Sequence, residues 1–270
     1  MRIARPQKGD MHITQWVPTS GKSPAWPVIQ SWMNTEWPRG KHKWLRSIPG
    51  NIEWIWNDVI KKFLASDSDY LWSTHEDIQY HPQTLKHLLS WKKPLVSALV
   101  FMRHNPVMPH IWHKYEDGDG AYAMRVDDTR AWFYKHPEYI IHGPFVMDPK
   151  PKDALEEINF SSTACTLIHR SVLEDMKEFC EEKWFVLDHE QDGGGEDRRF
   201  HELAVLAGYP GYVDRSCIVG HMVGDVAADA FDFIGWDSIS EIFNTGEPGR
   251  YKKPGEIQSL EAVERMEGQF

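Results

Sequence analysis

The sequence predicts an α/β fold, in which a doubly wound mixed sheet carries helices on both faces. Segments with the apolar run length of buried strands alternate with segments that have the apolar spacing of amphipathic helices. The chain has 270 residues, of which 41% are hydrophobic, and this is enough for the core of one large domain. In such folds ligands bind where strands end at their carboxyl side. The residues that follow each strand are therefore the candidates for a site.

The first part of the chain alternates regularly between the two kinds of element. A helix is expected from about Ser23, because Pro24 would stand at its first position. A second helix is indicated by five residues spaced along one face: Ile52, Trp56, Val59, Ile60 and Phe63. The expected strands cover residues 11–17, 43–48, 69–74 and 95–102, and the second and third helices cover 51–65 and 82–91.

The second part is less regular. Residues 103–160 are rich in Pro, Gly, His and aromatic side chains, and we expect long loops, which often carry function. Ser171 with Glu174 three positions later is a capping-box pattern at the start of a helix. Further expected elements are a strand at 163–169, a helix at 196–207 closed by Gly208, and a strand at 211–219. Residues 1–244 are expected to form a single catalytic domain and 245–270 a peripheral or disordered tail.

Composition narrows the class of protein. The formal net charge is −10, which weighs modestly against nucleic acid as a partner. No run of about 18 apolar residues is present, so no transmembrane segment is expected. The first ten residues lack the apolar stretch of a secretory signal. The three cysteines form no CxxC pair and indicate free thiols, and we expect a soluble protein in the reducing cytoplasm. Thirteen tryptophans offer stacking surfaces, although core packing explains most tryptophans equally well.

A first acidic group, His75-Glu76-Asp77, directly follows the strand expected at 69–74. Carboxylates at the carboxyl end of a strand can hold Mg²⁺ or Mn²⁺ beside a diphosphate, because hard cations prefer oxygen ligands. An exposed acidic turn that caps the next helix would give the same spacing.

A second acidic pair, Glu196-Asp197, follows three glycines and precedes an amphipathic helix. The helix dipole favours charged carboxylates at this position, and an ionised carboxylate can accept a proton from an attacking hydroxyl. Simple capping of the helix is the alternative.

The histidines are less specific signals. His221 follows the last apolar strand, and a neutral imidazole is a competent ligand for Mn²⁺. A structural role is the more common one for a single histidine. His110 and His113 are three positions apart, but Pro109 argues against a helix, and both are expected to lie in loops.

Together these segments resemble the family-2-like glycosyltransferases of the GT-A fold. The resemblance rests on the order of motifs between Met11 and Met222: a helix with Asn57, a strand, a DxD-like turn, a Pro-headed helix, an ED motif and a late histidine. It departs from the family pattern at His75, which stands where the first Asp of the DxD motif belongs.

The resemblance implies a role for several residues. Asp77 would bind Mn²⁺ or Mg²⁺ directly, and His221 would complete the metal shell. Asp197 would be the catalytic base, and Glu196 would bind the acceptor or orient the loop. The donor would be bound by Pro18, Thr19, Arg46, Asn57, His75, Glu76, Asp77 and Arg103. The acceptor would be bound by Ser162 and Thr163.

The sequence thus predicts a metal-dependent glycosyltransferase that moves a sugar from a nucleotide-sugar donor to a hydroxyl acceptor by direct, inverting displacement. The acceptor can be a glycan, a metabolite, a protein or a modified DNA base. A retaining transferase stays open, as does a non-catalytic carbohydrate- or nucleic-acid-associated binding protein. A nucleotidyltransferase is disfavoured, because Gly21-Lys22-Ser23 is too short a match to a phosphate-binding loop.

Overall fold

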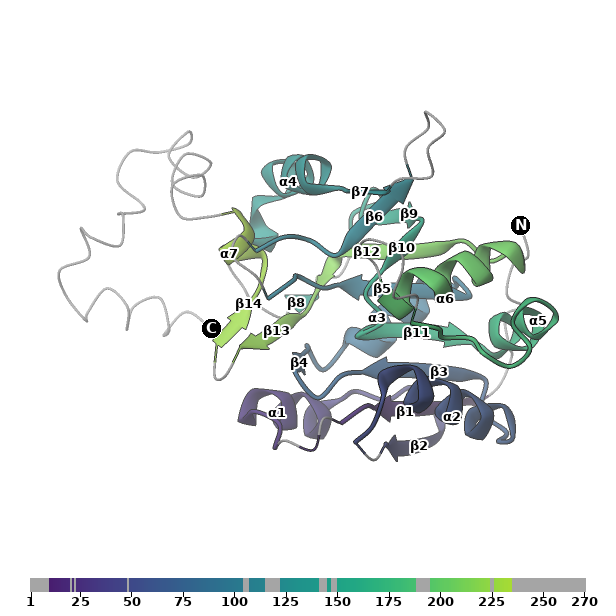
Figure 1. Cartoon of the computed structure of the whole chain (residues 1–270). Coiled ribbons are helices and arrows are strands. Elements are labelled where there is room, and N and C mark those ends of the chain that lie inside the picture. Colours follow the sequence, from purple (N-terminus) through teal and green to yellow (C-terminus); the bar gives the residue numbers. More distant parts are fainter. Residues whose placement is uncertain are drawn as a thin grey trace, which may run out of the picture.

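The structure is a computed structural model, shown in Figure 1. It describes the residues 10–19, 21, 23–47, 49–103, 107–114, 122–140, 145–146, 150–187, 195–223 and 226–234. The expected tail at 245–270 lies outside the described residues. Within the described segments, no helix combines the length and the apolar character needed to cross a membrane.

Strands and helices alternate along the chain, as the sequence predicts. The helices are α1 (Trp26–Asn34), α2 (Ile52–Leu64), α3 (Thr84–Ser90), α4 (Val126–Lys135), η1 (Pro137–Tyr139), α5 (Arg170–Cys180), α6 (Gly195–Leu206) and α7 (Ala230–Ile234). The first strands are β1 (Met11–Val17), β2 (Gly40–Arg46), β3 (Tyr70–Thr74), β4 (Ile78–Gln79), β5 (Leu95–Leu99), β6 (Ile111–Lys114) and β7 (Tyr122–Met124). The later strands are β8 (Phe145–Val146), β9 (Leu155–Ile158), β10 (Phe160–Ser161), β11 (Cys165–His169), β12 (Gly211–Ile218), β13 (Gly220–Val223) and β14 (Val226–Ala228).

The main sheet has eight strands in the order β2-β1-β3-β11-β5-β12-β8, with β9 also paired to β12. Strand β1 is parallel to β2 and β3, and β12 is parallel to β5. Strand β11 runs antiparallel between β3 and β5. The sheet is therefore mixed, and the amino end of β11 lies at the same edge as the carboxyl ends of β3 and β5. The sequence predicts this arrangement of a mixed sheet with helices.

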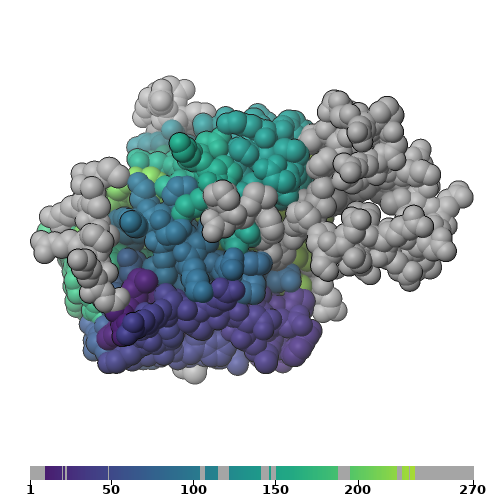
Figure 2. All heavy atoms as spheres, turned by 180° about the vertical axis from the view of Figure 1, so that it is seen from behind, coloured from purple at the N-terminus to yellow at the C-terminus, as the bar shows by residue number. Residues whose placement is uncertain are grey.

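Helices cover both faces of the sheet. One buried cluster joins α2, α5 and α6 to residues such as Trp16, Leu71 and Ile168 on one face. A second cluster joins α3 to Ile13 of β1 and Trp72 of β3, which lie on the other face of the sheet. In the space-filling view from behind, the N-terminal segments form the lower layer and the middle of the chain lies above them (Figure 2). Opposite faces of β1 and β3 are thus buried against different helices, as in a doubly wound fold.

Several expected boundaries are wrong. Helix α1 begins at Trp26 and not near Ser23, because Pro27 in a longer helix would clash with the carbonyl of residue 23. Strand β2 begins at Gly40, where it pairs with Met11. The capping box is also wrong: the side chain of His169 caps α5 by accepting from the backbone N–H of Ser171. Gly208, in contrast, ends α6 with a positive φ of 88°, as expected.

Residues 103–160 are not mainly loops. They contribute β6, β7 and α4 among the described residues, and β6 pairs with β7 and β10 in a three-stranded sheet. His113 lies within β6 and not in a loop. The apolar positions Trp132 and Phe133 bury one side of α4. Histidines and aromatics at alternate positions conceal a strand pattern, because they are neither clearly apolar nor clearly polar.

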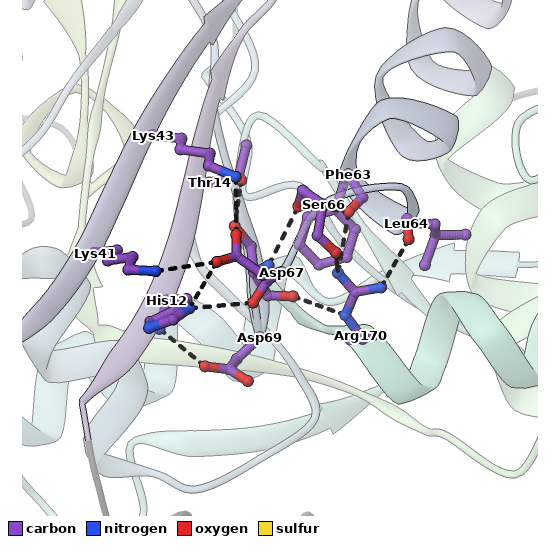
Figure 3. Close-up of polar contacts among 11 residues, drawn as sticks. His12, Thr14, Lys41, Lys43, Phe63, Leu64, Ser66, Asp67, Asp69 and Arg170 are labelled. Atoms are coloured by element: carbon purple, nitrogen blue, oxygen red, sulfur yellow. Dashed lines mark hydrogen bonds and ion pairs between the residues drawn. The ribbon is translucent and has the colours of Figure 1, made fainter.

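The amino ends of β1, β2 and β3 are joined by a polar cluster (Figure 3). The guanidinium of Arg170, at the start of α5, donates to the backbone carbonyls of Ser68, Leu64, Phe63 and Ser66 at 2.7, 3.0, 3.1 and 2.7 Å. Phe63 and Leu64 end α2, and Ser66 and Ser68 lie in the segment between α2 and β3. This cluster fixes the edge of the sheet opposite the candidate site.

Candidate functional site at the carboxyl edge of the sheet

The predicted site residues gather at one edge of the main sheet. Thr19 follows β1, Arg46 ends β2, His75 follows β3 and Arg103 follows β5. His221 follows β12, in the short strand β13. Thr163 precedes the antiparallel strand β11 and so reaches the same edge. Two backbone contacts link these segments: the N–H of His75 donates to the carbonyl of Ala164 at 2.9 Å, and β13 pairs with β4.

Asp77 and His221 are brought together although they are distant in sequence. His221 lies in β13, opposite Ile78 of β4, and not simply at the end of a strand. Its Nε2 lies 3.5 Å from Asp77 Oδ2, and its Nδ1–H donates to the carbonyl oxygen of Phe101 at 2.8 Å. Arg103 Nη1 lies 2.8 Å from the same Oδ2. The turn after β3 is therefore tied to the end of β5 and to β13.

The charge of Asp77 is stabilised by its surroundings. Burial by itself would raise the pKa of this carboxyl, but the hydrogen bond to His221 and the charges of His75, His221 and Arg103 bring the pKa to about 2. Asp77 is consequently ionised at neutral pH, which is the form that binds a cation.

His75 has a different environment from Asp77. Its ring lies near the indoles of Trp16 and Trp56, with centroids 6.3 and 6.4 Å apart. Its Nε2 is buried and has no hydrogen-bond partner among the described residues. Burial chiefly lowers its pKa, to about 4, so the ring is neutral at pH 7.

A divalent cation fits part of this arrangement. A carboxylate oxygen of Asp77 and the Nε2 of His221 are donors that Mn²⁺ accepts. Within the described parts of the chain, no group of three or more His, Cys, Asp and Glu side chains could hold a metal ion by itself. Metal binding by Asp77 and His221 stays a prediction, in which diphosphate oxygens and water would complete the shell.

Thr19, Glu76 and Arg46 form a second contact group beside this turn. Thr19 Oγ1 donates to Glu76 Oε2 at 2.5 Å and accepts from Arg46 Nη2 at 3.3 Å. Pro18 precedes Thr19 in the loop after β1. Asn57 does not join the group in this structure: its amide pairs with the backbone N–H and carbonyl of Phe185, at 3.1 and 2.8 Å. Donor binding by all of these residues stays a prediction.

Asp197 lies in the first turn of α6, and Thr163 binds one of its two carboxylate oxygens. Both the backbone N–H of Thr163, at 3.2 Å, and the Thr163 hydroxyl donate to Oδ1 of Asp197. Its other oxygen, Oδ2, has no partner among the described residues. Burial chiefly, and then the charge of Glu196, raise the pKa of Asp197 to about 7. Burial also raises the pKa of Glu196.

The expected acceptor residues are largely buried. Thr163 is 1% exposed and Ser162 9%, and the Thr163 hydroxyl is used by Asp197. This geometry fits positioning of the carboxylate better than direct contact with a second substrate. Acceptor binding by these two residues, and the roles of Glu196 and Asp197, stay predictions.

Comparisons with known proteins establish no family. No protein family model matches the sequence, and no curated protein matches it. Among solved structures, the chain is similar to A197 from STIV, with a TM-score of 0.49, 14% identity and coverage of 80% of this chain and 87% of that one. It is also similar to S. aureus TarS 1-349, with a TM-score of 0.39, 11% identity and coverage of 76% and 57%. The chain thus spans little more than half of the TarS length.

Proposed function

We propose that this chain is a glycosyltransferase that moves a sugar from a nucleotide-sugar donor to a hydroxyl acceptor, in a metal-dependent and inverting reaction. The observation that carries the proposal is the contact between Asp77 and His221, at 3.5 Å, beside Arg103. An ionised carboxylate, an imidazole nitrogen and a guanidinium at the carboxyl edge of an α/β sheet suit a diphosphate group.

The donor diphosphate would lie at the turn 75–77. Asp77 and His221 would hold Mn²⁺ or Mg²⁺, which supplies positive charge to the departing diphosphate. Arg103 is half exposed and pairs with Asp77, so its guanidinium is available to a phosphate beside that carboxylate. Thr19 and Arg46 would contact the nucleoside or its phosphate from the neighbouring strand ends.

Asp197 would act on the acceptor. Because Thr163 donates only to Oδ1, Oδ2, which has no partner among the described residues, can take the proton of the attacking hydroxyl. A pKa of about 7 suits a general base, since a substantial fraction is ionised at neutral pH while the group still binds a proton well. Attack on the anomeric carbon opposite the leaving diphosphate would invert its configuration.

The direct test is a panel of nucleotide sugars with Mn²⁺, in which release of the nucleoside diphosphate is measured. The acceptor is unknown, so slow donor hydrolysis is the expected signal. We expect one donor to be hydrolysed with metal and not with EDTA, and the activity to be lost in Asp77→Ala. Failure of every donor to bind or react, with a folded protein, would contradict the proposal and favour a non-catalytic binding protein.

A further inference from the structure

A pocket of about 610 Å³ opens between α1 and β2, beside the candidate site and outside its predicted residues except for Arg46. This volume falls within the range of small-molecule sites. The pocket is lined by Gln15, Pro24, Ile29, Trp32, Met33, Trp37, His42, Lys43, Trp44 and Arg46. Three of these are tryptophans, and they come from two separate elements and the segment between them.

The indoles form rigid walls. Trp32 and Trp44 meet edge to face, with centroids 5.3 Å apart and an angle of 81°. Trp37 stacks on His42 at 4.5 Å. Trp44 is 51% exposed and Met33 74%, which is unusual for side chains of this size beside an open cavity. A flat ring can stack against such a surface at low entropic cost.

The pocket offers few acceptors for sugar hydroxyls. Gln15 donates from Nε2 to Thr74 Oγ1 and to Tyr80 OH, at 2.8 and 3.0 Å, and its Oε1 already accepts from Trp44 Nε1 at 2.5 Å. The lining residues include no Asp, Glu or Asn, although Trp32 Nε1 and His42 Nδ1 have no partner among the described residues. A bound sugar would therefore leave many of its hydroxyl groups without an acceptor, whereas an aromatic ring has no such need.

One end of the pocket is cationic. Arg46 bonds to the neutral hydroxyl of Thr19, and no ion pair engages its charge among the described residues. Lys43 is paired with Asp67, at 2.8 Å, on the side away from Arg46's partner Thr19. Burial lowers the pKa of His42, so this ring adds no charge at neutral pH. The guanidinium of Arg46 is thus the available positive group at the end nearest the candidate site.

We propose that this pocket binds a planar aromatic ring that carries an anionic group, with the ring against the tryptophan walls and the anion at Arg46. The inference does not depend on sugar transfer. Two sources share this chemistry: the base and phosphate of a nucleotide, and a separate aromatic acid or phosphate. The experiment below distinguishes them.

Five probes separate the parts of this recognition, each titrated into the whole chain by calorimetry or fluorescence. Anilinonaphthalene sulfonate has a ring and an anion, UDP and GDP have a base and a diphosphate, pyrophosphate has no ring, and decyl sulfate has an alkyl chain in place of the ring. We expect at least one of the ring anions to bind saturably, and about tenfold or more tighter than pyrophosphate or decyl sulfate, because ring stacking contributes that much. Equal affinity for decyl sulfate would overturn the proposal.

Charge at the rim gives a second test that leaves the core intact. Met33 is exposed, so Met33→Asp and Met33→Lys should both fold. Met33→Asp should weaken binding of the ring anion severalfold and Met33→Lys should not, whereas the same affinity in both variants would place the ligand elsewhere.

Trp44→Ala should remove the preference for a ring, with the exposed Trp54→Ala on α2 as its control. Displacement of the sulfonate by UDP or GDP would identify the ring as a nucleobase, and saturable binding without displacement would identify a separate aromatic anion.

Discussion

Nε2 of His221 faces the carboxylate of Asp77 at 3.5 Å, while its Nδ1 is committed to the carbonyl of Phe101. A carbonyl oxygen only accepts, so Nδ1 must carry the hydrogen. Nε2 is then the ring nitrogen that faces the carboxylate, whose Oδ2 Arg103 Nη1 also approaches at 2.8 Å. In the proposed metal site, the contact to Phe101 would orient His221 to bind the cation through Nε2.

The metal site leads to a first prediction. Asp77→Ala should abolish metal-dependent binding of a nucleoside diphosphate. His221→Ala should weaken this binding at least tenfold, since it removes one of the two side chains proposed to bind the metal. His75→Ala should have a smaller effect, because its Nε2 is buried near Trp16 and Trp56. Titration calorimetry with Mn²⁺ present and absent measures all three. Complete loss in His75→Ala with an unchanged thermal midpoint would instead identify His75 as a metal ligand.

A second prediction separates donor binding from chemistry. Asp197→Asn should keep donor affinity and reduce the transfer rate by about 10²–10⁴, the usual contribution of a general base. The amide has nearly the same shape, and Thr163 can still donate to its oxygen. Transfer rate and donor affinity are measured on the same preparation. A rate within a few-fold of the unmodified protein would exclude Asp197 as the base.

The same variant has an expected effect on stability. The pKa of Asp197 in the folded protein, about 7, is above its unfolded value near 3.9. Its contribution to stability is then complete below about pH 4 and is lost as pH rises through 7. At pH 8, where the buried charge is unfavourable, Asp197→Asn should raise the thermal midpoint. A lower midpoint at pH 8 would mean that the ionised carboxylate holds the fold together.

A third prediction concerns the opposite edge of the sheet. Arg170→Ala should destabilise the fold by about 2–4 kcal/mol, because four backbone carbonyls, in the last turn of α2 and in the segment after it, lose a charged donor. Arg170→Lys should recover only part of this, since an ammonium cannot reproduce the planar fork. Arg39→Ala is the matched control, because its ion pair with Asp10 is exposed and contributes little. Denaturant unfolding gives the values, and similar losses at both arginines would contradict the assignment.

Much of this architecture can be predicted from residue pattern. The alternation of strands and helices places the turn at 75–77 and His221 after strands and Asp197 at the start of a helix, and topology then brings them to one edge. The contact of His221 with Asp77 could be expected only through resemblance, because no local pattern encodes pairing between segments so far apart in sequence. His75 shows what a motif cannot predict. The sequence places it at the first position of the DxD-like turn, but its environment is set by packing near Trp16 and Trp56.

The tryptophan pocket was beyond sequence reasoning for a similar reason. Its signal is the alternation of His42, Trp44 and Arg46 on one face of β2, which is readable only once the strand is known to begin at Gly40. An expected start at residue 43 leaves out His42, the first residue of that pattern. The exposed Trp44 could then be recognised as unusual only from the fold.

The pH dependence of transfer gives the last prediction. Asp197 must be ionised to act as a base, so the transfer rate at low substrate should rise with pH and level off above about 7. The charge of Glu196 is one cause of the raised pKa of Asp197. Glu196→Gln removes that charge, which should lower the pKa of Asp197 and move the midpoint of the rate profile to lower pH.

The matched control for this shift is Glu178→Gln, an exposed position on α5, which should leave the midpoint unchanged. At pH 6 the Glu196→Gln enzyme should retain a larger fraction of its maximal rate than the unmodified enzyme, because more of its Asp197 is ionised there. A uniform loss of rate with the same midpoint would mean that Glu196 contacts the acceptor and does not tune the base. A midpoint that moves upward would contradict the electrostatic coupling of the two carboxylates, and with it the assignment of the titrating group to Asp197.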